Sequence, residues 1–435
     1  MNILKKNYHL ILLFFFILIY TLILSPIDLD EIWSYGFAHN LYSGLIPYKD
    51  FNMVITPFHP FIMSLPMYIF GSNILLFHIE NAIVITIMLY LLFKLIGKNT
   101  YFLIPFFIWP LSIIYPNYNV FALFLFILLI YLEDKESNDY LIGFIIGLLF
   151  LTKQSIGLPV LLTIIFTFDK EKIIKRLIGF IIPNIIFFIY LLITNSLKEF
   201  IDLCVLGLLD FNNGNGSLNV LFFITIIFIV LIIISIIKDK KNIINYYLLF
   251  FSSIVIPLFD YYHYMLFFIA FLIVFFINNK TNIRFDIVGK VLLLLFVLLE
   301  LLSFDTTNSI YPNDINRFEY RYMDYNSLKS TKEVNELIKK YNKVIIIGQD
   351  SYYHKLILDE KINYLDLINK GNLGYHGTDK LLKMIKELDK DYYYFVNRSD
   401  LKRKTQTDPT IIKYIINNGK LIEKTKYYDI YRLDN

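Results

Sequence analysis

The chain has 435 residues, of which 57% are hydrophobic, and its mean hydropathy is +0.56. This composition excludes an ordinary soluble domain, because a bilayer-spanning helix needs about 20 mostly apolar residues and the sequence supplies such runs repeatedly. A net charge of only +4 gives no support for nucleic-acid binding. The single cysteine, Cys204, excludes a disulfide within one chain and makes a thiolate metal site unexpected.

The first long apolar run, Tyr8 to Ile27, follows Lys5 and Lys6. It is long for the apolar core of a signal peptide, and Ser25-Pro26-Ile27-Asp28 is a poor cleavage site, so we interpret the run as a retained first transmembrane helix. Together with later apolar runs it predicts about eleven spans. They lie near residues 8–27, 73–96, 101–116, 118–132, 139–151, 155–168, 177–194, 218–237, 243–257, 263–277 and 286–303.

Lysine and arginine residues in the short connections predict the orientation of the chain. If the N-terminal lysines are inside, the inner connections are basic, as at Lys170–Arg176 and Lys238–Lys241. The outer connections, such as Asn195–Gly216, carry few cations. We therefore expect a multi-pass protein of the cytoplasmic membrane with its N-terminus inside. Because the number of spans is odd, the C-terminus is expected outside.

The composition changes near Phe304, after which the chain is charged and no longer continuously apolar. Alternating helices and strands in this segment predict a small α/β domain. The expected helices cover 330–341, 379–388 and 409–418, and the expected strands cover 343–348, 392–396 and 427–433. The sequence is thus divided into a membrane domain, 1–303, whose first outer loop is 28–72, and an extracytoplasmic domain, 304–435.

The predicted orientation places a group of three carboxylates, Asp28, Asp30 and Glu31, on the outer side, directly after the first span. A carboxylate at a membrane boundary can act as a general base or hold a divalent cation. Alternatively, the three residues cap the helix that follows, since acidic groups stabilise a first turn; the two interpretations are compatible. His78 and Glu80, in the outer half of the second span, can pair structurally or take part in catalysis.

Two further outer connections carry candidate residues. Lys153-Gln154 interrupts the apolar sequence FLTKQSIGLP, where a lysine could meet a phosphate at headgroup depth. The alternative is a snorkelling lysine that marks a turn. His263 follows Asp260 and Tyr262 in DYYHY. It is either a substrate donor whose tautomer Asp260 sets, or a member of an interfacial aromatic belt.

The segment DEIWSYGFAHNLYSGLIPYKDFNMVITPFHPFIMSLPMYIFG resembles the first periplasmic loop of the GT-C superfamily of polytopic glycosyltransferases. The bacterial branch with the lipid A aminoarabinose transferases and the protein O-mannosyltransferases is the most similar. The resemblance depends on Asp30-Glu31, on Gly-x-x-Pro-Tyr-x-Asp-Phe at 44–51 and on Thr56-Pro57. Lys153-Gln154 is similar to a Lys-Gln pair of such relatives. The resemblance is specific over 28–71 and weak elsewhere.

This resemblance implies an α-helical polytopic membrane protein of GT-C type, whose first outer loop forms juxtamembrane helices over a lipid-facing cavity. The donor would be a polyprenyl-phosphate sugar, the acceptor an envelope glycan, lipid or protein, and transfer would invert the anomeric centre. Asp30 would deprotonate the acceptor hydroxyl, and Glu31 and Asp28 would orient this base or hold an ion. The substrate-binding residues would be Lys153, Gln154, His263, Tyr262, Lys49 and Asp50. No cofactor is expected, although some branches of the family use a divalent metal.

Two other functions fit the same composition. A transporter or flippase of lipid-linked sugars would share the many spans, but it would more often show broken helices with paired charges at mid-membrane, which are sparse here. A non-catalytic envelope scaffold would use residues 304–435 as its working part. That segment carries no motif of a catalytic type, and we interpret it as an acceptor-side or assembly module.

Overall fold

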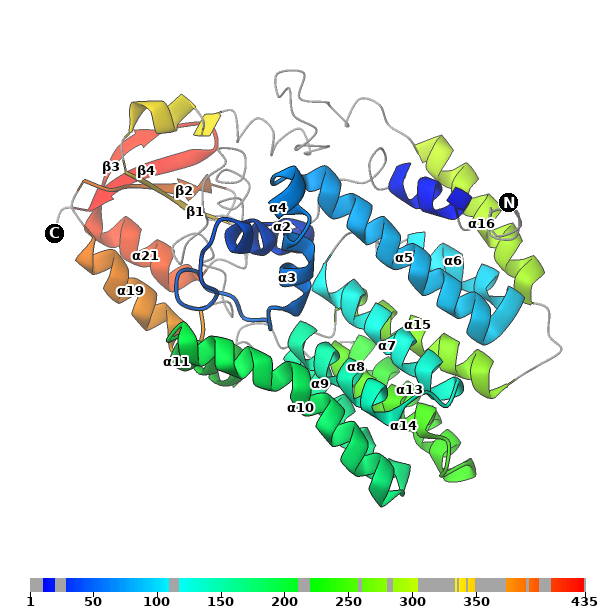
Figure 1. The fold of residues 1–435 in the computed structure, drawn as a ribbon. Coiled ribbons are helices and arrows are strands. Elements are labelled where there is room, and N and C mark those ends of the chain that lie inside the picture. Colours follow the sequence, from blue (N-terminus) through cyan, green and yellow to red (C-terminus); the bar gives the residue numbers. More distant parts are fainter. Residues whose placement is uncertain are drawn as a thin grey trace. The chain divides into compact units, whose positions relative to one another are not determined.

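The computed structural model is mainly helical and carries one small β-sheet near the C-terminus (Figure 1). It describes residues 11–19, 29–108, 117–209, 220–256, 260–279, 285–303, 333–334, 336–341, 343–348, 373–388, 391–398 and 408–433. Asp28 and the composition change near Phe304 lie outside these ranges.

The chain forms two compact units. The first unit consists of residues 1–34, 55–190 and 217–305, and the second of residues 35–54, 191–216 and 306–435. The second unit therefore includes two segments of the first 303 residues in addition to the C-terminal segment. The division of the sequence at residue 303 stays a prediction.

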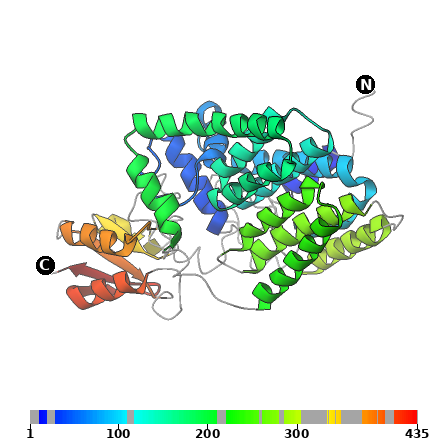
Figure 2. The same ribbon diagram turned by 90° about the horizontal axis from the view of Figure 1, so that it is seen from below.

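The first unit is a bundle of apolar helices, and the predicted spans are helical wherever they fall within the described residues. A helix over 11–19 is followed by α3 (Phe58–Ser64), α4 (Met67–Phe70), α5 (Ile74–Ile96), α6 (Thr100–Ile108), α7 (Tyr118–Asp134), α8 (Asp139–Thr152), α9 (Gln154–Leu161), α10 (Lys170–Ile193), α13 (Val220–Lys238), α14 (Ile243–Phe251), α15 (Tyr261–Asn278) and α16 (Phe285–Ser303). Helix α16 packs along α6, and α14 contacts both α13 and α15. In Figure 2 the green helices of residues 220–278 lie side by side.

Within the residues that the structure describes, four helices are long and apolar enough to cross a membrane: Leu76–Phe107, Lys170–Ile193, Val220–Lys238 and Tyr261–Asn278. Shorter apolar helices, such as Asp139–Thr152, lie between them. The α-helical polytopic fold class expected from the sequence is thereby confirmed, whereas the number of spans stays a prediction.

Polar residues that interrupt the apolar runs begin several of these helices. Asn117 accepts hydrogen bonds from two backbone N–H groups of α7, and Asn138, Asn242 and Asp260 cap α8, α14 and α15 in the same way. The N–H groups of a first turn have no partner within their own helix, so each cap satisfies donors that would be costly to bury.

Glycines allow α8 and α10 to approach closely. A Cβ on Gly143 would lie 2.0 Å from the carbonyl oxygen of Arg176, and one on Gly179 would lie 2.1 Å from the carbonyl oxygen of Tyr140. Gly143 and Gly147 form a Gly-x-x-x-Gly pattern on α8. Small residues at such positions favour helix association in bilayers, where packing replaces the hydrophobic effect as the driving force.

The second unit contains most of α2 (Leu29–Tyr42), which begins in the first unit, and also α11 (Leu197–Phe200). A π-helical turn, Ile201–Leu206, follows α11 directly. The segment Asn195–Gly216, expected as an outer loop, is thus helical over 197–209. The glycine and asparagine residues at 212–216 predicted a loop for the whole segment, although the residues before them are apolar enough to form a helix.

In the described part of the C-terminal segment, the sheet has four strands in the order β1-β2-β4-β3: β1 (Val344–Ile347), β2 (Tyr393–Asn397), β3 (Gly419–Lys424) and β4 (Tyr428–Leu433). Strands β1 and β2 are parallel, and the other neighbours are antiparallel. The predicted strands correspond to β1, β2 and β4, and two predicted helices to α19 (Gly377–Glu387) and α21 (Pro409–Asn418). The small C-terminal α/β fold is confirmed.

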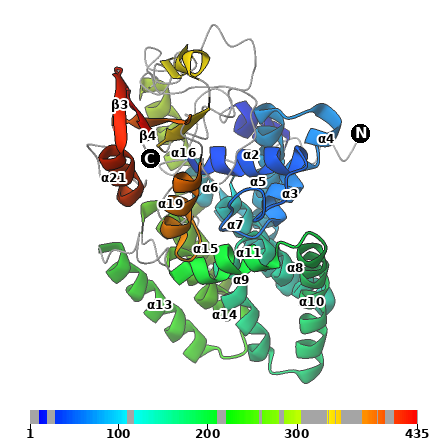
Figure 3. The same cartoon turned by 90° about the vertical axis from the view of Figure 1, so that its left-hand side faces the viewer.

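Both faces of this sheet are covered. Ile345 and Ile347 of β1 pack with α19 and α21, whereas Ile346 packs with Val334 and Leu337. Figure 1 and Figure 3 show α19 and α21 on the same side of the strands. Strand β3 was not predicted from the sequence. It is an exposed edge strand, and such edges often carry charged residues, which interrupt the alternation of apolar and polar residues that is typical of a strand.

Candidate functional site

Two of the predicted carboxylates lie in the first turn of α2, which begins at Leu29. Glu31 is fully buried, and His78 Nε2 of α5 contacts its Oε1 atom. Asp30, one residue earlier, is half-buried. The structure therefore gives Glu31 a pairing partner within the bundle and leaves Asp30 nearer to the surface, while both also suit the positive end of the helix.

Lys153 lies at the tip of a helical hairpin formed by α8 and α9. Its backbone is extended (φ −151°, ψ 103°), so one helix ends at Thr152 and the next begins at Gln154. The Nζ atom donates a hydrogen bond to Asn119 Oδ1 at 2.6 Å and lies 5.6 Å from the centre of the Tyr118 ring. The ammonium is thus held by the first turn of α7.

Asp260 and His263 form a second anchored pair. Asp260 caps α15 by accepting the backbone N–H of His263 at 2.8 Å, and the Nδ1 atom of His263 lies 2.8 Å from Asp260 Oδ2. A carboxylate beside Nδ1 favours the tautomer with the proton there, which leaves Nε2 as the acceptor. Neighbouring Tyr262 exchanges hydrogen bonds with the Asn117 side chain at 2.8 and 3.1 Å, which ties α15 to α7.

Electrostatic coupling connects these groups to Asp30. Burial lowers the pKa of Lys153 to about 8, whereas the carboxylates of Asp30 and Asp260 favour its charged form. Burial works to raise the pKa of Asp260, but His263 and Lys153 hold it below its ordinary value. Asp30 and Asp260 therefore both lie within electrostatic range of Lys153, although each is more than a hundred residues away from it along the chain.

We call this group the Lys153 cluster. All of its members belong to the first unit. It consists of Asp30, Asn117, Tyr118, Asn119, Lys153, Asp260, Tyr262 and His263. An ammonium, two carboxylates, two phenols and an imidazole can together bind an anion and accept a proton from a hydroxyl. The two asparagines were not among the predicted site residues, although Asn-Tyr-Asn at the start of an apolar helix was a signal for them.

The other predicted binding residues have different surroundings. Gln154 is buried in the first turn of α9. Lys49 and Asp50 belong to the second unit, where Lys49 Nζ donates to the carbonyl of Thr194 at 3.2 Å. Asp50 Oδ2 accepts the backbone N–H of Ile46 at 2.7 Å and so closes a turn. A role for these three residues in substrate binding stays a prediction.

The loop motif at 44–51 has a clear structural basis. Gly44 adopts φ +80°, which is costly for other residues. Tyr48 is fully buried against Phe200, and Phe51 stacks on Phe37. The glycine, tyrosine and phenylalanine of the motif therefore hold the loop in one conformation within the second unit.

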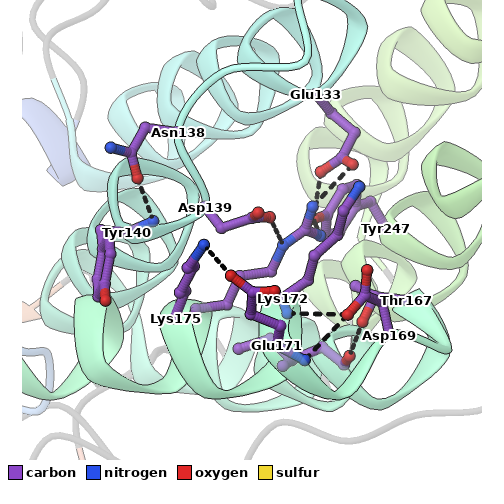
Figure 4. A network of polar contacts seen from close by, with 12 residues as sticks. Glu133, Asn138, Asp139, Tyr140, Thr167, Asp169, Glu171, Lys172, Lys175 and Tyr247 are labelled. Carbon is purple, nitrogen blue, oxygen red and sulfur yellow. Dashed lines mark hydrogen bonds and ion pairs between the residues drawn. The ribbon is translucent and has the colours of Figure 1, made fainter.

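A second buried polar cluster centres on Arg176 of α10. Its guanidinium donates to Glu133 at 2.9 Å, to Asp139 at 2.7 Å and to the Tyr247 hydroxyl at 3.0 Å. Tyr247 in turn donates to Glu133 at 2.9 Å, and Figure 4 shows Glu133, Asp139 and Tyr247 converging. These hydrogen bonds join α7, α8, α10 and α14, and the polar groups of the cluster are partners of one another. We therefore interpret the cluster as structural.

Among the described residues, no group of three or more His, Cys, Asp or Glu side chains is arranged to hold a metal ion. Asp28, the third of the predicted carboxylates, lies outside these residues.

No family model matches the sequence, and no curated protein is recognisably similar to it in sequence. Solved structures are similar in fold. ArnT from Cupriavidus metallidurans in the apo state superposes with a TM-score of 0.59 at 9% identity, and the alignment covers 99% of this chain and 98% of that one. ArnT from the same organism bound to undecaprenyl phosphate gives 0.54 at 9% identity and covers 98% of both chains. The chain is therefore an integral membrane protein with the GT-C fold of ArnT.

Proposed function

We propose that this protein is a membrane glycosyltransferase that takes a sugar from a polyprenyl-phosphate donor. The acceptor is an envelope glycan, lipid or protein, and transfer inverts the anomeric centre. The reaction takes place on the outer face of the cytoplasmic membrane, with the N-terminus inside and the C-terminal domain outside, as the distribution of basic residues indicates.

The observation that carries this proposal is the Lys153 cluster within this particular fold. A half-buried ammonium is held by Asn119 and is electrostatically coupled to Asp30. The similar fold of ArnT was solved with undecaprenyl phosphate bound, which is a lipid phosphate of the proposed kind. An ammonium opposite a carboxylate supplies both a site for a phosphate and a base for an attacking hydroxyl.

In the proposed mechanism the acceptor hydroxyl attacks the anomeric carbon from the side opposite the lipid phosphate. Asp30 accepts the hydroxyl proton as the new C–O bond forms. The bond between the anomeric carbon and the phosphate oxygen breaks, and the negative charge that develops on the leaving phosphate is stabilised by Lys153. His263, oriented by Asp260, and the Tyr262 hydroxyl are further donors or acceptors for the sugar.

The arrangement of Glu31 explains why it is not the preferred base. Its carboxylate is fully buried and contacted by His78. A buried, paired carboxylate is poorly placed to meet a substrate hydroxyl, whereas it can fix the start of α2 and with it the position of Asp30. We therefore assign Glu31 a positioning role, and Asp30 the role of base.

The test is a transfer assay on the purified protein in detergent, with radiolabelled polyprenyl-phosphate sugars as donors and a crude envelope fraction as acceptor. Wild type is compared with Asp30→Asn, and with Glu171→Gln as a control at an exposed carboxylate of the same unit. Loss of lipid-bound label that requires both the acceptor and Asp30 supports the proposal. Full activity of Asp30→Asn would show that the base is wrongly assigned. If the donor binds but is never consumed, a transporter or a scaffold becomes the better interpretation.

A further inference from the structure

A groove of about 970 Å³ lies entirely within the second unit. Its walls come from the last turn of α10, from α11 with the π-helical turn that follows, from the first loop at Lys49, and from α19 of the C-terminal domain. Figures 1 and 3 show α11 beside α19. A volume of this size is at the upper end of typical ligand pockets.

The two main walls are joined by specific contacts. The backbone carbonyl of Asp202 accepts the N–H of Tyr375 at 3.3 Å, and the Asp202 side chain forms an ion pair with Lys380. Gly374 has φ +78°, and a Cβ there would lie 2.8 Å from the Asp202 carboxylate. Only glycine therefore allows this approach, and the groove is a built feature of the unit. One of its walls includes the π-helical turn Ile201–Leu206, a geometry that is frequent at functional sites.

The walls of the groove are largely apolar. Leu192, Ile201, Leu206 and Met384 line it and are 50, 42, 39 and 38% exposed. An exposed apolar surface of this kind is unfavourable in water unless something covers it.

The charges of the groove are unequal. Three lysines, Lys49, Lys198 and Lys380, line it against two carboxylates, Glu199 and Asp202. Lys380 is paired with Asp202, whereas no carboxylate in the described part of the chain pairs with Lys49 or Lys198. The Glu199 Oε2 atom is buried and, within that same part, accepts no hydrogen bond. The groove thus offers two cations for an anion and one acceptor for a hydroxyl.

We propose that this groove binds an anionic amphiphile from the bilayer. Its apolar chain would lie along the leucine-rich wall, its phosphate head would meet Lys49 and Lys198, and a head-group hydroxyl would donate to Glu199. Leu191 and Leu192 of the wall belong to the last turn of α10, a candidate membrane-spanning helix, so the apolar wall begins at the membrane boundary. This binding is separate from sugar transfer and does not depend on it.

The experiment uses the full-length protein in phosphatidylcholine nanodiscs that contain a small fraction of diazirine-labelled phosphatidylglycerol. After illumination, the cross-linked peptides are mapped by mass spectrometry. Labelling is expected in residues 191–206 and 373–384. In the double variant Lys49→Gln, Lys198→Gln it should fall roughly fivefold to tenfold, since two charge-assisted contacts at a partly exposed site are lost. The matched control, Lys413→Gln with Lys420→Gln, removes two lysines that do not line the groove and should label as wild type does.

Three outcomes would overturn the proposal. One is equal labelling of the groove by a diazirine-labelled phosphatidylcholine, which would show that the anionic head is not recognised. Another is unchanged labelling in the double variant. The third is complete displacement of the probe by millimolar inorganic phosphate, which would show a phosphate site that does not require the apolar chain.

Discussion

Replacing Lys153 with methionine tests the cluster most directly, because methionine keeps most of the length of the side chain and removes its charge. Among the described residues, the ammonium donates a hydrogen bond to Asn119 and lies over the Tyr118 ring. Two unit charges about 4 Å apart interact by about 4 kcal/mol at an effective dielectric constant of about 20. Since Lys153 is only half-buried, we reduce this to about 3 kcal/mol of stabilisation for the leaving phosphate.

A loss of about 3 kcal/mol in the transition state corresponds to a rate lower by about two orders of magnitude. The assay is the rate of sugar transfer at saturating donor and acceptor, with size-exclusion chromatography to show that the variant is folded. Lys135→Met, at an exposed lysine paired with Asp134, is the matched control and should retain the wild-type rate. If Lys153→Met transfers sugar within about threefold of wild type, the charge does not stabilise the leaving group and this assignment fails.

Three further predictions follow from the described contacts. Because the pKa of Lys153 is lowered to about 8, its ammonium is present below that pH and lost above it. The affinity for the donor, measured from pH 6.5 to 9.5, should therefore fall as the pH rises through about 8. The variant Lys153→Arg should abolish this fall, because an arginine keeps its charge over the whole range. Arg176→Met leaves two carboxylates, Glu133 and Asp139, which are only 15 and 17% exposed, without their cationic partner and should cost about 3 kcal/mol. The thermal unfolding midpoint in detergent should therefore fall well below that of wild type, whereas exposed Lys98→Met should leave it unchanged. Gly143→Val would force α8 and α10 apart and should prevent recovery of folded protein. The control Leu141→Ala, on an exposed part of the same helix, should fold as wild type does. A folded, wild-type-like Gly143→Val variant would refute the close packing.

The fold and much of the Lys153 cluster could be predicted from the sequence because the signals are local. Apolar runs of sufficient length specify helices, and the polar interruptions at Lys153 and at Asp260 mark their ends. The alternation of basic and neutral connections then predicted that these interruptions share one side with Asp30. Their roles in catalysis stay predictions, although the structure places them within electrostatic range.

Other features depended on contacts that no local pattern reports. The Asp50 carboxylate closes a turn, a contact that the sequence did not indicate, while its role in substrate binding stays a prediction. The π-helical turn Ile201–Leu206 packs beside the C-terminal domain, more than 150 residues later in the chain, and neither segment alone indicates this. Strand β3 is exposed on the edge of the sheet, so its sequence lacks the apolar alternation of a strand. Its pairing with β4 in the structure identifies it.

The sharp junction between α8 and α9 also restricts how this chain can change in length. Only Lys153 separates the two helices, and Gly157 lies directly against the backbone of Phe150 across the hairpin. One inserted or deleted residue rotates the following helix by about 100° and shifts it by about 1.5 Å. Such a change would turn Gly157 away from Phe150 and carry the ammonium away from Asn119. Length variation among close relatives is therefore expected to spare this junction, even where the surrounding apolar residues are freely exchanged.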